Sequence, residues 1–249
     1  MRQRLMVVVA HPDDESFGCG STLLHAAAAG VTTAVVCATR GEAGDPAPGS
    51  HVGHAELARV RERELHEAAN ILGVSSVRLL DFTDSGMAGD ADASTLVGAP
   101  FGAVRDAVRG QVEDFRPHVV ITLDAADGHR DHARIRDATV AAVEGTQVQR
   151  VYLQCLSQEL MQRWLEHARI ATPDSAYLTA SGTPDPLVTT LLDSADLLPL
   201  REKAIAAHGS QVSPYAGLPP DLYRNFLTVE RLQRVVPPWS GGERETGLF

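Results

Sequence analysis

The residues best suited to chemistry lie in two short segments, HPDDE and DAADGHRDH. The first segment places one imidazole and three carboxylates in five consecutive positions, from His11 to Glu15. Such a group is costly to bury, because like charges repel one another and each buried carboxylate needs a partner. A bound divalent cation would offset that repulsion. The alternative is a solvated acidic turn whose histidine caps a local backbone group.

The second segment, residues 124–132, favours the interpretation as a metal site. It contains His129 and His132, which stand three positions apart. Two imidazoles and one carboxylate that leave a coordination position open form the usual catalytic zinc site. The same set of ligands accepts iron(II). We therefore expect Zn²⁺ as the cofactor, with Fe²⁺ as the alternative metal.

Both segments follow short apolar runs that are typical of strands buried on both faces. The chain alternates such runs with stretches in which apolar residues recur at helical spacing. This alternation predicts an α/β fold with a doubly wound, mainly parallel sheet, Rossmann-like in type. In such sheets ligands bind beyond the carboxyl ends of the strands, which is where both segments fall. The predicted strands are residues 5–10, 32–38, 77–80, 118–123 and 151–154, and the predicted helices are 20–29, 55–72, 100–115 and 131–143.

From residue 157 onward the pattern is less regular. Prolines surround one clear helix at about residues 198–208, and we expect the last ten residues, SGGERETGLF, to be frayed. We interpret this region as an irregular C-terminal elaboration of the same domain. The sequence thus predicts one domain over residues 1–249.

Charge and composition exclude several classes of partner. A net charge of -10 and a pI of about 5.4 argue against nucleic acid or an anionic membrane surface. No stretch approaches the ~20 apolar residues of a membrane span, and the N-terminus lacks a signal-peptide pattern. We expect a cytoplasmic protein. Its three cysteines (Cys19, Cys37 and Cys155) have no CxxC spacing, so we expect buried thiols and no disulfide framework.

Two other site types fit the first segment less well. The stretch Gly18-Cys19-Gly20 lacks the third glycine of the GxGxxG dinucleotide motif, and acidic residues precede it where a pyrophosphate would lie. Ser16 and Cys19 are not surrounded by the GxSxG pattern of a nucleophile elbow. We therefore expect neither a dinucleotide site nor a covalent mechanism.

The chain resembles the PIG-L/LmbE-type N-deacetylases, a family that includes the deacetylases of mycothiol and glycosylphosphatidylinositol biosynthesis and enzymes of antibiotic pathways. The resemblance rests on AHPDDE at residues 10–15 and GHRDH at residues 128–132. Weaker matches, over about residues 5–215, are TRGEAG at 39–44, RxxEL at 61–65, DSGMAG at 84–89 and HGSQ at 208–211. Arg130 departs from the pattern, since the family usually has proline there. This change could alter the rigidity of the loop or add a contact to the substrate.

The resemblance implies that His11, Asp14 and His132 bind zinc. It also implies that Asp13 is the general base that takes a proton from the water activated at the metal. This agrees with the chemistry of a zinc hydrolase, in which the ion polarises the amide carbonyl and a nearby carboxylate accepts the proton.

Further roles follow from the same resemblance. A protonated His129 would stabilise the oxyanion or assist the leaving amine, and Asp131 would support His129 or His132. Arg61 and Asp84 would bind sugar hydroxyls, and Arg40 is another polar candidate for substrate contact. The alternatives from the residues alone are a solvated helix charge for Arg61 and a turn residue for Asp84.

The leading interpretation is a zinc-dependent enzyme that removes an acyl group, acetyl in the first instance, from the nitrogen of a small amino-sugar conjugate. One alternative is an amidase of a larger conjugate, such as a mercapturic-acid-forming thiol conjugate; the size of the substrate distinguishes the two. Another is a catalytically silent sugar-binding relative. The presence of both Asp13 and His129 argues against a silent protein.

Overall fold

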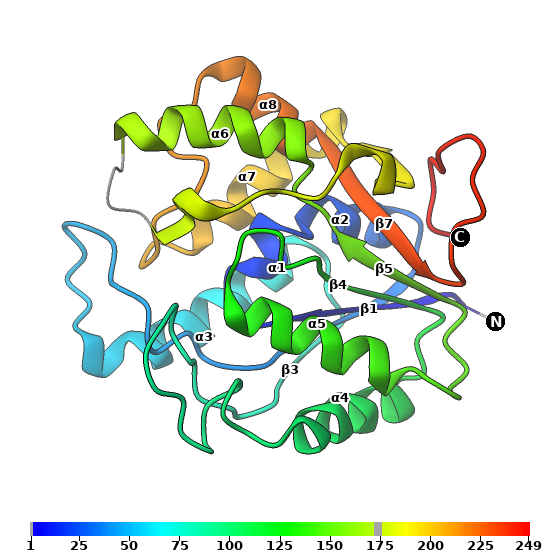
Figure 1. Ribbon diagram of the computed structural model, residues 1–249, viewed down its shortest axis with the longest axis horizontal. Helices are drawn as coiled ribbons and strands as arrows, with labels where there is room; N and C mark the ends of the chain where they lie inside the picture. Colours follow the sequence, from blue (N-terminus) through cyan, green and yellow to red (C-terminus); the bar gives the residue numbers. More distant parts are fainter. Residues whose placement is uncertain (1, 172–175) are drawn as a thin grey trace.

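The computed structural model describes residues 2–171 and 176–249, and seven strands in this part of the chain form a single mixed sheet (Figure 1). Their order across the sheet is β3-β2-β1-β4-β5-β7-β6. The first five strands run parallel, whereas β7 is antiparallel to both of its neighbours. The strands are β1 (Arg4–Val9), β2 (Thr32–Cys37), β3 (Ser76–Leu79), β4 (Val119–Leu123), β5 (Arg150–Gln154), β6 (Thr190–Asp193) and β7 (Val229–Val236).

Helices cover both faces of the sheet (Figure 1). None of the helices in the described residues is long and apolar enough to cross a membrane. The α-helices are α1 (Asp14–Phe17), α2 (Gly20–Ala28), α3 (His54–Ile71), α4 (Phe101–Phe115), α5 (Arg130–Ala142), α6 (Gln158–Ala171), α7 (Leu198–Ala207) and α8 (Pro220–Thr228). Short 3-10 helices occupy Ala176–Thr179, Asp185–Leu187 and Ala195–Leu197.

Alternating side chains of the parallel strands build two cores. Leu5 and Val7 of β1 join one apolar cluster with residues of α2, α3 and α7. Met6 and Val8 face the other way and join a second cluster with residues of α4 and α5. Successive side chains of a strand point to opposite faces of the sheet. When helices cover both faces, the side chains on each face must therefore be apolar. The continuous apolar runs in the sequence therefore have a direct structural cause.

The predicted fold class, α/β with a mainly parallel sheet, is confirmed. The predicted strands and helices of the first 154 residues lie within two residues of the observed bounds. The C-terminal region is more regular than expected, since it adds α6, α8 and the two antiparallel strands to the predicted helix α7. The expectation of frayed last residues is wrong. Glu245 exchanges backbone hydrogen bonds with Thr189 and Leu191, and Leu248 is buried.

The order of the strands fixes where a site can form. From β1 the chain moves outward through β2 to β3, and it then returns to β4 on the other side of β1. The loops after β1 and β4 therefore diverge to opposite sides, which leaves a crevice at their carboxyl ends. Both chemically distinctive segments of the sequence follow these two strands.

Candidate metal centre

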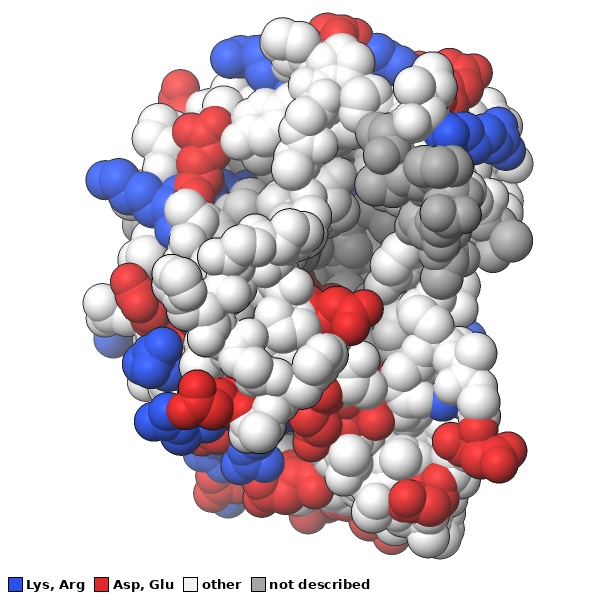
Figure 2. Space-filling model, turned by 90° about the vertical axis from the view of Figure 1, so that its left-hand side faces the viewer, with Lys and Arg blue, Asp and Glu red and all other residues white. Residues whose placement is uncertain are grey.

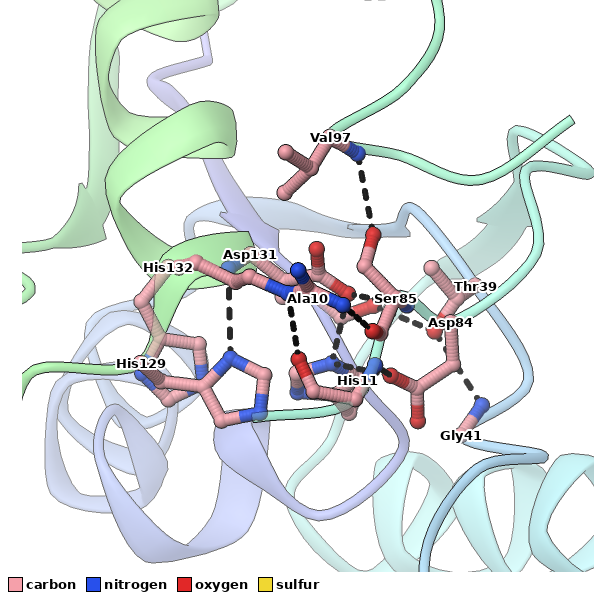
Figure 3. A network of polar contacts seen from close by, with 12 residues as sticks. Ala10, His11, Thr39, Gly41, Asp84, Ser85, Val97, His129, Asp131 and His132 are labelled. Atoms are coloured by element: carbon pink, nitrogen blue, oxygen red, sulfur yellow. Dashed lines mark hydrogen bonds and ion pairs between the residues drawn. The ribbon is translucent and has the colours of Figure 1, made fainter. Parts of the chain in front are cut away.

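Three buried imidazoles meet at this crevice (Figure 3). His11 directly follows the bend after β1, whereas His129 caps the amino end of α5 and His132 lies in its first turn. The ring centroids are 4.6 Å apart for His11 and His129, and 4.7 Å apart for His129 and His132. The strand-end segments thus converge as the sequence predicted.

Two overlapping groups of side chains in the described residues could hold a metal ion. One group consists of His11, His129 and His132, and the other consists of His11, Asp84 and Asp131. In each group the ligand atoms lie within 4.8 Å of one another. Asp14 bridges the histidines that the sequence assigns to zinc. Its Oδ1 lies 3.2 Å from His132 Nε2, and its Oδ2 lies 3.5 Å from His11 Nδ1.

Each of the two assigned histidines has a second carboxylate behind it. His11 Nε2 lies 3.3 Å from Asp131 Oδ2, and His132 Nδ1 lies 2.7 Å from Asp127 Oδ2. Such carboxylates fix the tautomer and orientation of a metal-binding histidine. The nitrogens that remain, His11 Nδ1 and His132 Nε2, both face Asp14. Because His132 Nε2 is buried and makes no hydrogen bond, these residues fit a metal ion.

The sequence analysis did not identify Asp127. The signal was present, because Asp127 belongs to the same polar segment as His132 and stands five residues before it. Its other oxygen, Oδ1, accepts a hydrogen bond from the backbone N–H of His129 at 3.0 Å. One carboxylate therefore ties both histidines of the segment to the loop before α5.

Carboxylates control the pKa values of the assigned ligands. Burial opposes the cationic form of His132, but Asp14 and Asp127 outweigh it and raise its pKa to about 10. The pKa of His11 is also raised, against burial, by Asp131, Asp14 and Asp84. The pKa of Asp14 lies well below its usual range, because the two imidazoles outweigh its own burial. A cation entering the site must therefore displace protons from the histidines.

Asp13 lines the same cavity as the histidines and pairs with Arg61. Its backbone has a φ of 129°, and its N–H donates to Glu15 Oε2 at 2.9 Å. Arg61 Nη2 donates to Asp13 Oδ2 at 3.0 Å, and its Nη1 donates to the carbonyl of Gly41 at 2.8 Å. Burial raises the pKa of Asp13 to about 6, although the Arg61 cation lowers it.

Arg61 is only 4% exposed, so the alternative of a solvated helix charge is wrong. The glycines of the TRGEAG segment explain how it fits. A Cβ at Gly41 would lie 2.3 Å from the guanidinium carbon of Arg61, and one at Gly44 would lie 2.7 Å from its Nη1. Arg61 therefore positions Asp13 and also lines the pocket described below.

The surroundings of His129 and Asp131 differ from the expectation. The backbone N–H of Asp131 donates to His129 Nδ1 at 3.2 Å, which places the ring proton of a neutral imidazole on Nε2. In the metal-free protein, burial and the neighbouring imidazoles lower the pKa of His129 to about 4, which opposes the expected cationic form. The side chain of Asp131 contacts His11 and accepts from the backbone of Ser85 at 2.9 Å. It therefore supports His11, and not His129 or His132 as expected.

The remaining candidates separate into one inside the site and one outside it. Asp84 is buried, and its Oδ1 lies 3.5 Å from His11 Nε2. Its pKa is lowered, mainly because His11 outweighs the effect of burial. Arg40 instead pairs with Glu62 and Asp81 at 2.7 Å each and does not line the pocket. The structure therefore gives no support to a contact between Arg40 and the substrate.

A cavity of about 430 Å³ opens over the histidines, a size that suits a small-molecule ligand. His11, Asp13, Asp14, Arg61 and Asp84 line its polar side. Residues of α6 and α8 line another side, which the sequence analysis missed because it interpreted that region as irregular. Figure 2 shows that the face towards which the strands end is hollowed.

Comparison with known proteins identifies relatives of this chain. Residues 6–143 match the family profile described as "PIG-L: GlcNAc-PI de-N-acetylase". The chain is 34% identical over 250 residues to 1D-myo-inositol 2-acetamido-2-deoxy-alpha-D-glucopyranoside deacetylase of Kineococcus radiotolerans, with 85% of this chain and 69% of that protein covered. The zinc-inhibited form of teicoplanin deacetylase Orf2 has a similar structure, with a TM-score of 0.65, 21% identity, and coverage of 93% of this chain and 97% of that one.

The fold alone does not determine the reaction. GalB, the 4-carboxy-2-hydroxymuconate hydratase from Pseudomonas putida KT2440, matches with a TM-score of 0.64 at 20% identity, covering 96% of this chain and 99% of that one. The family match is more specific, because it spans more than half of the chain and includes both metal-site segments. The protein is therefore a hydrolase of amide bonds that belongs to the PIG-L family of de-N-acetylases.

Proposed function

We propose that this protein is a zinc-dependent deacetylase that hydrolyses the N-acetyl group of a small molecule built on an amino sugar. One observation carries the proposal: two histidines, each oriented by a carboxylate, present their remaining nitrogens to Asp14 beside Asp13. The name of the Kineococcus radiotolerans relative supports an acetamido sugar as the substrate class.

His11, Asp14 and His132 would hold the metal. Zinc, when bound there, would polarise the amide carbonyl and lower the pKa of a water molecule towards ~7. Iron(II) is the other metal that this donor set accepts. His11, Asp14 and His132 all line the cavity, so a metal held by them would be accessible from it. A substrate amide can therefore reach the metal.

Asp13 accepts the proton from the attacking water and passes it to the nitrogen of the departing amine. Its raised pKa of about 6 suits both steps near neutral pH, since it is ionised there yet is a stronger base than an ordinary carboxylate. His129 donates through its Nε2–H to the carbonyl oxygen as negative charge builds up. Arg61 and Asp84 stand at the same cavity and bind sugar hydroxyls.

The test is acetate release from N-acetylglucosamine and from its inositol glycoside, with zinc-loaded, iron(II)-loaded and metal-free protein. We expect His11→Ala and His132→Ala to lose tight metal binding and activity together. His66→Ala, an exposed histidine of α3, is the matched control and should retain both. Full zinc stoichiometry in either site variant would refute the ligand assignment. Sugar binding without acetate release would support a silent binding protein.

A further inference from the structure

Part of the cavity lining is apolar. Its side chains come from α1, from the end of β5, from α6, and from α8 and the loop before it. Most of them belong to one apolar cluster that packs between α6 and α8. We call this set of residues the apolar wall: Phe17, Leu156, Met161, Trp164, Tyr215 and Phe226.

The polar atoms of the aromatic residues in this wall are already engaged. Trp164 Nε1 donates to the carbonyl of Pro214 at 3.0 Å, and Tyr215 Oη donates to the carbonyl of Phe17 at 2.6 Å. The two glutamines that line the cavity also donate to nearby backbone carbonyls, Gln154 to Cys155 and Gln211 to Ser210. The wall therefore offers a ligand mainly ring faces and aliphatic surface.

The metal centre, the apolar wall and the polar side chains all line the same cavity. Arg61 belongs to α3 and Asp84 follows β3, on one side of β1. The wall is built largely from elements that follow β5, on the other side of β4. A substrate whose sugar hydroxyls meet Arg61 and Asp84 thus has an apolar surface within the same cavity. A second polyhydroxylated ring packed against these six side chains would lose water and gain few hydrogen bonds from them, which is unfavourable.

An apolar substituent would instead gain from burial against the wall, because the removal of apolar surface from water is favourable. We propose that the apolar wall binds an aromatic or aliphatic group of the substrate, carried either as the aglycone of the amino sugar or as its acyl chain. This inference rests on the proposed deacetylase function and narrows its substrate class.

The first experiment compares kcat/KM for four substrates: N-acetylglucosamine, its inositol glycoside, its phenyl glycoside and N-octanoylglucosamine. Because even one well-placed methylene changes kcat/KM by ~10-fold or more, we expect an advantage of at least ~10-fold for an apolar substrate. A preference for the phenyl glycoside identifies the aglycone as the bound group, and one for the octanoyl amide identifies the acyl chain. Equal rates, or a preference for the inositol glycoside, would refute the inference and leave the deacetylase function intact.

The second experiment locates the preference on the wall. Trp164→Ala should reduce the ratio of kcat/KM between the preferred apolar substrate and N-acetylglucosamine by about 10-fold, a ratio that partial unfolding does not change. Ile170→Ala is the control on the same helix, because Ile170 is 85% exposed and lies outside the cavity. An unchanged ratio in Trp164→Ala, or an equal fall in both variants, would count against the wall.

A binding measurement separates this inference from the proposed function. The amines phenyl glucosaminide and methyl glucosaminide are products and need no turnover, so calorimetry can compare their Kd values directly. Tighter binding of the phenyl compound, lost in Trp164→Ala, supports the wall even if no substrate releases acetate. Equal Kd values together with normal acetate release would refute the proposed role of the apolar wall and leave the deacetylase function standing.

Discussion

At the scale of single residues, four carboxylates of the site have different tasks. Asp14 lies between His11 and His132, where a metal would bind, and Asp131 and Asp127 hold the far nitrogens of these two rings. Asp13 is turned towards Arg61. The roles that we propose for neighbouring positions in HPDDE, ligand and base, thus depend on the sharp turn of the backbone at Asp13.

The acid limb of the pH profile should report Asp13. Burial raises its pKa to about 6 and the general base must be ionised, so kcat/KM should fall as the pH drops through about 6. Arg61 lowers this pKa, so Arg61→Met should move the acid limb to higher pH. Arg63→Met, an exposed change on the same helix, should leave the limb in place. An unmoved limb in Arg61→Met would assign the limb to another group.

His129 should act as a neutral donor. We expect His129→Ala to lower kcat by ~10²–10³, the usual effect of losing an oxyanion donor, with zinc content retained. A neutral donor does not titrate at alkaline pH, so we expect the alkaline limb of the kcat profile to be the same in His129→Ala as in the wild type. His129→Gln, which keeps an N–H donor, should recover part of the loss. Loss of zinc from His129→Ala would instead make this residue a metal ligand.

At the scale of elements, α5 is fastened to the loop that carries Asp84. Arg130, in the first turn of α5, donates to the carbonyl of Gly86 at 2.8 Å and to that of Gly89 at 2.8 Å. It also donates to the carbonyls of Ser85 and Ala88. The arginine that replaces the usual proline of GHRDH therefore orders the DSGMAG loop.

Arg130→Ala should loosen this loop without removing the metal. Hydrogen bonds from a charged group contribute roughly 1.5–3 kcal/mol each, so we expect the free energy of unfolding to fall by about 1–3 kcal/mol after relaxation. The KM for the amino sugar should rise more than kcat falls, because Asp84 is the residue displaced. Urea unfolding and steady-state kinetics test this, with the surface variant Arg105→Ala as the control. Unchanged stability and KM would show that the loop does not need Arg130.

At the scale of the whole molecule, the sequence predicted the parallel half of the sheet and missed the antiparallel edge. Buried parallel strands form continuous apolar runs, whereas β6 has only four residues and β7 mixes charged with apolar ones. Leu160, Met161, Trp164 and Leu165 recur at helical spacing in α6, a signal that the surrounding prolines obscured.

The candidate site was predictable to the same extent. Residue types and strand ends predicted that the two polar segments would meet, since parallel strands end at a common edge. The choice of His11, Asp14 and His132 as ligands came from the family resemblance. The pairing of Asp131 with His11 and the outward position of Arg40 depend on loop conformation, which no local pattern specifies. The apolar wall depends on elements distant in the chain that pack together.

Metal binding should couple the whole fold to pH. In metal-free protein the pKa of His132 is raised from 6.5 to about 10. Its contribution to stability is therefore fully present below 6.5 and is lost as the pH rises through about 10, by up to ~1.4 kcal/mol per pH unit for one proton. In the metal-loaded form no proton would occupy the liganding nitrogen of His132. Its stability should therefore not decrease through this titration as the pH rises.

We therefore expect the difference in Tm between metal-loaded and metal-free protein to widen from pH 7 to pH 9.5. Calorimetric scans of both forms, freed of unbound metal, measure it. In metal-free His132→Asn, Tm should fall less steeply with rising pH than it does in the metal-free wild type. Parallel curves for the two forms of the wild type would contradict the prediction.

The apolar wall has a consequence for inheritance. The assigned metal ligands and the base lie between residues 11 and 132, whereas every wall residue except Phe17 lies between 156 and 226. On our proposals, the residues of the reaction and those that select the apolar group are thus encoded in separate stretches of the gene. Substitutions in α6 and α8 can therefore change which apolar group the enzyme accepts while the hydrolytic residues stay the same. Recombination that exchanges the gene segment after residue 155 would transfer most of the apolar wall from one relative to another without exchanging the metal ligands or the base.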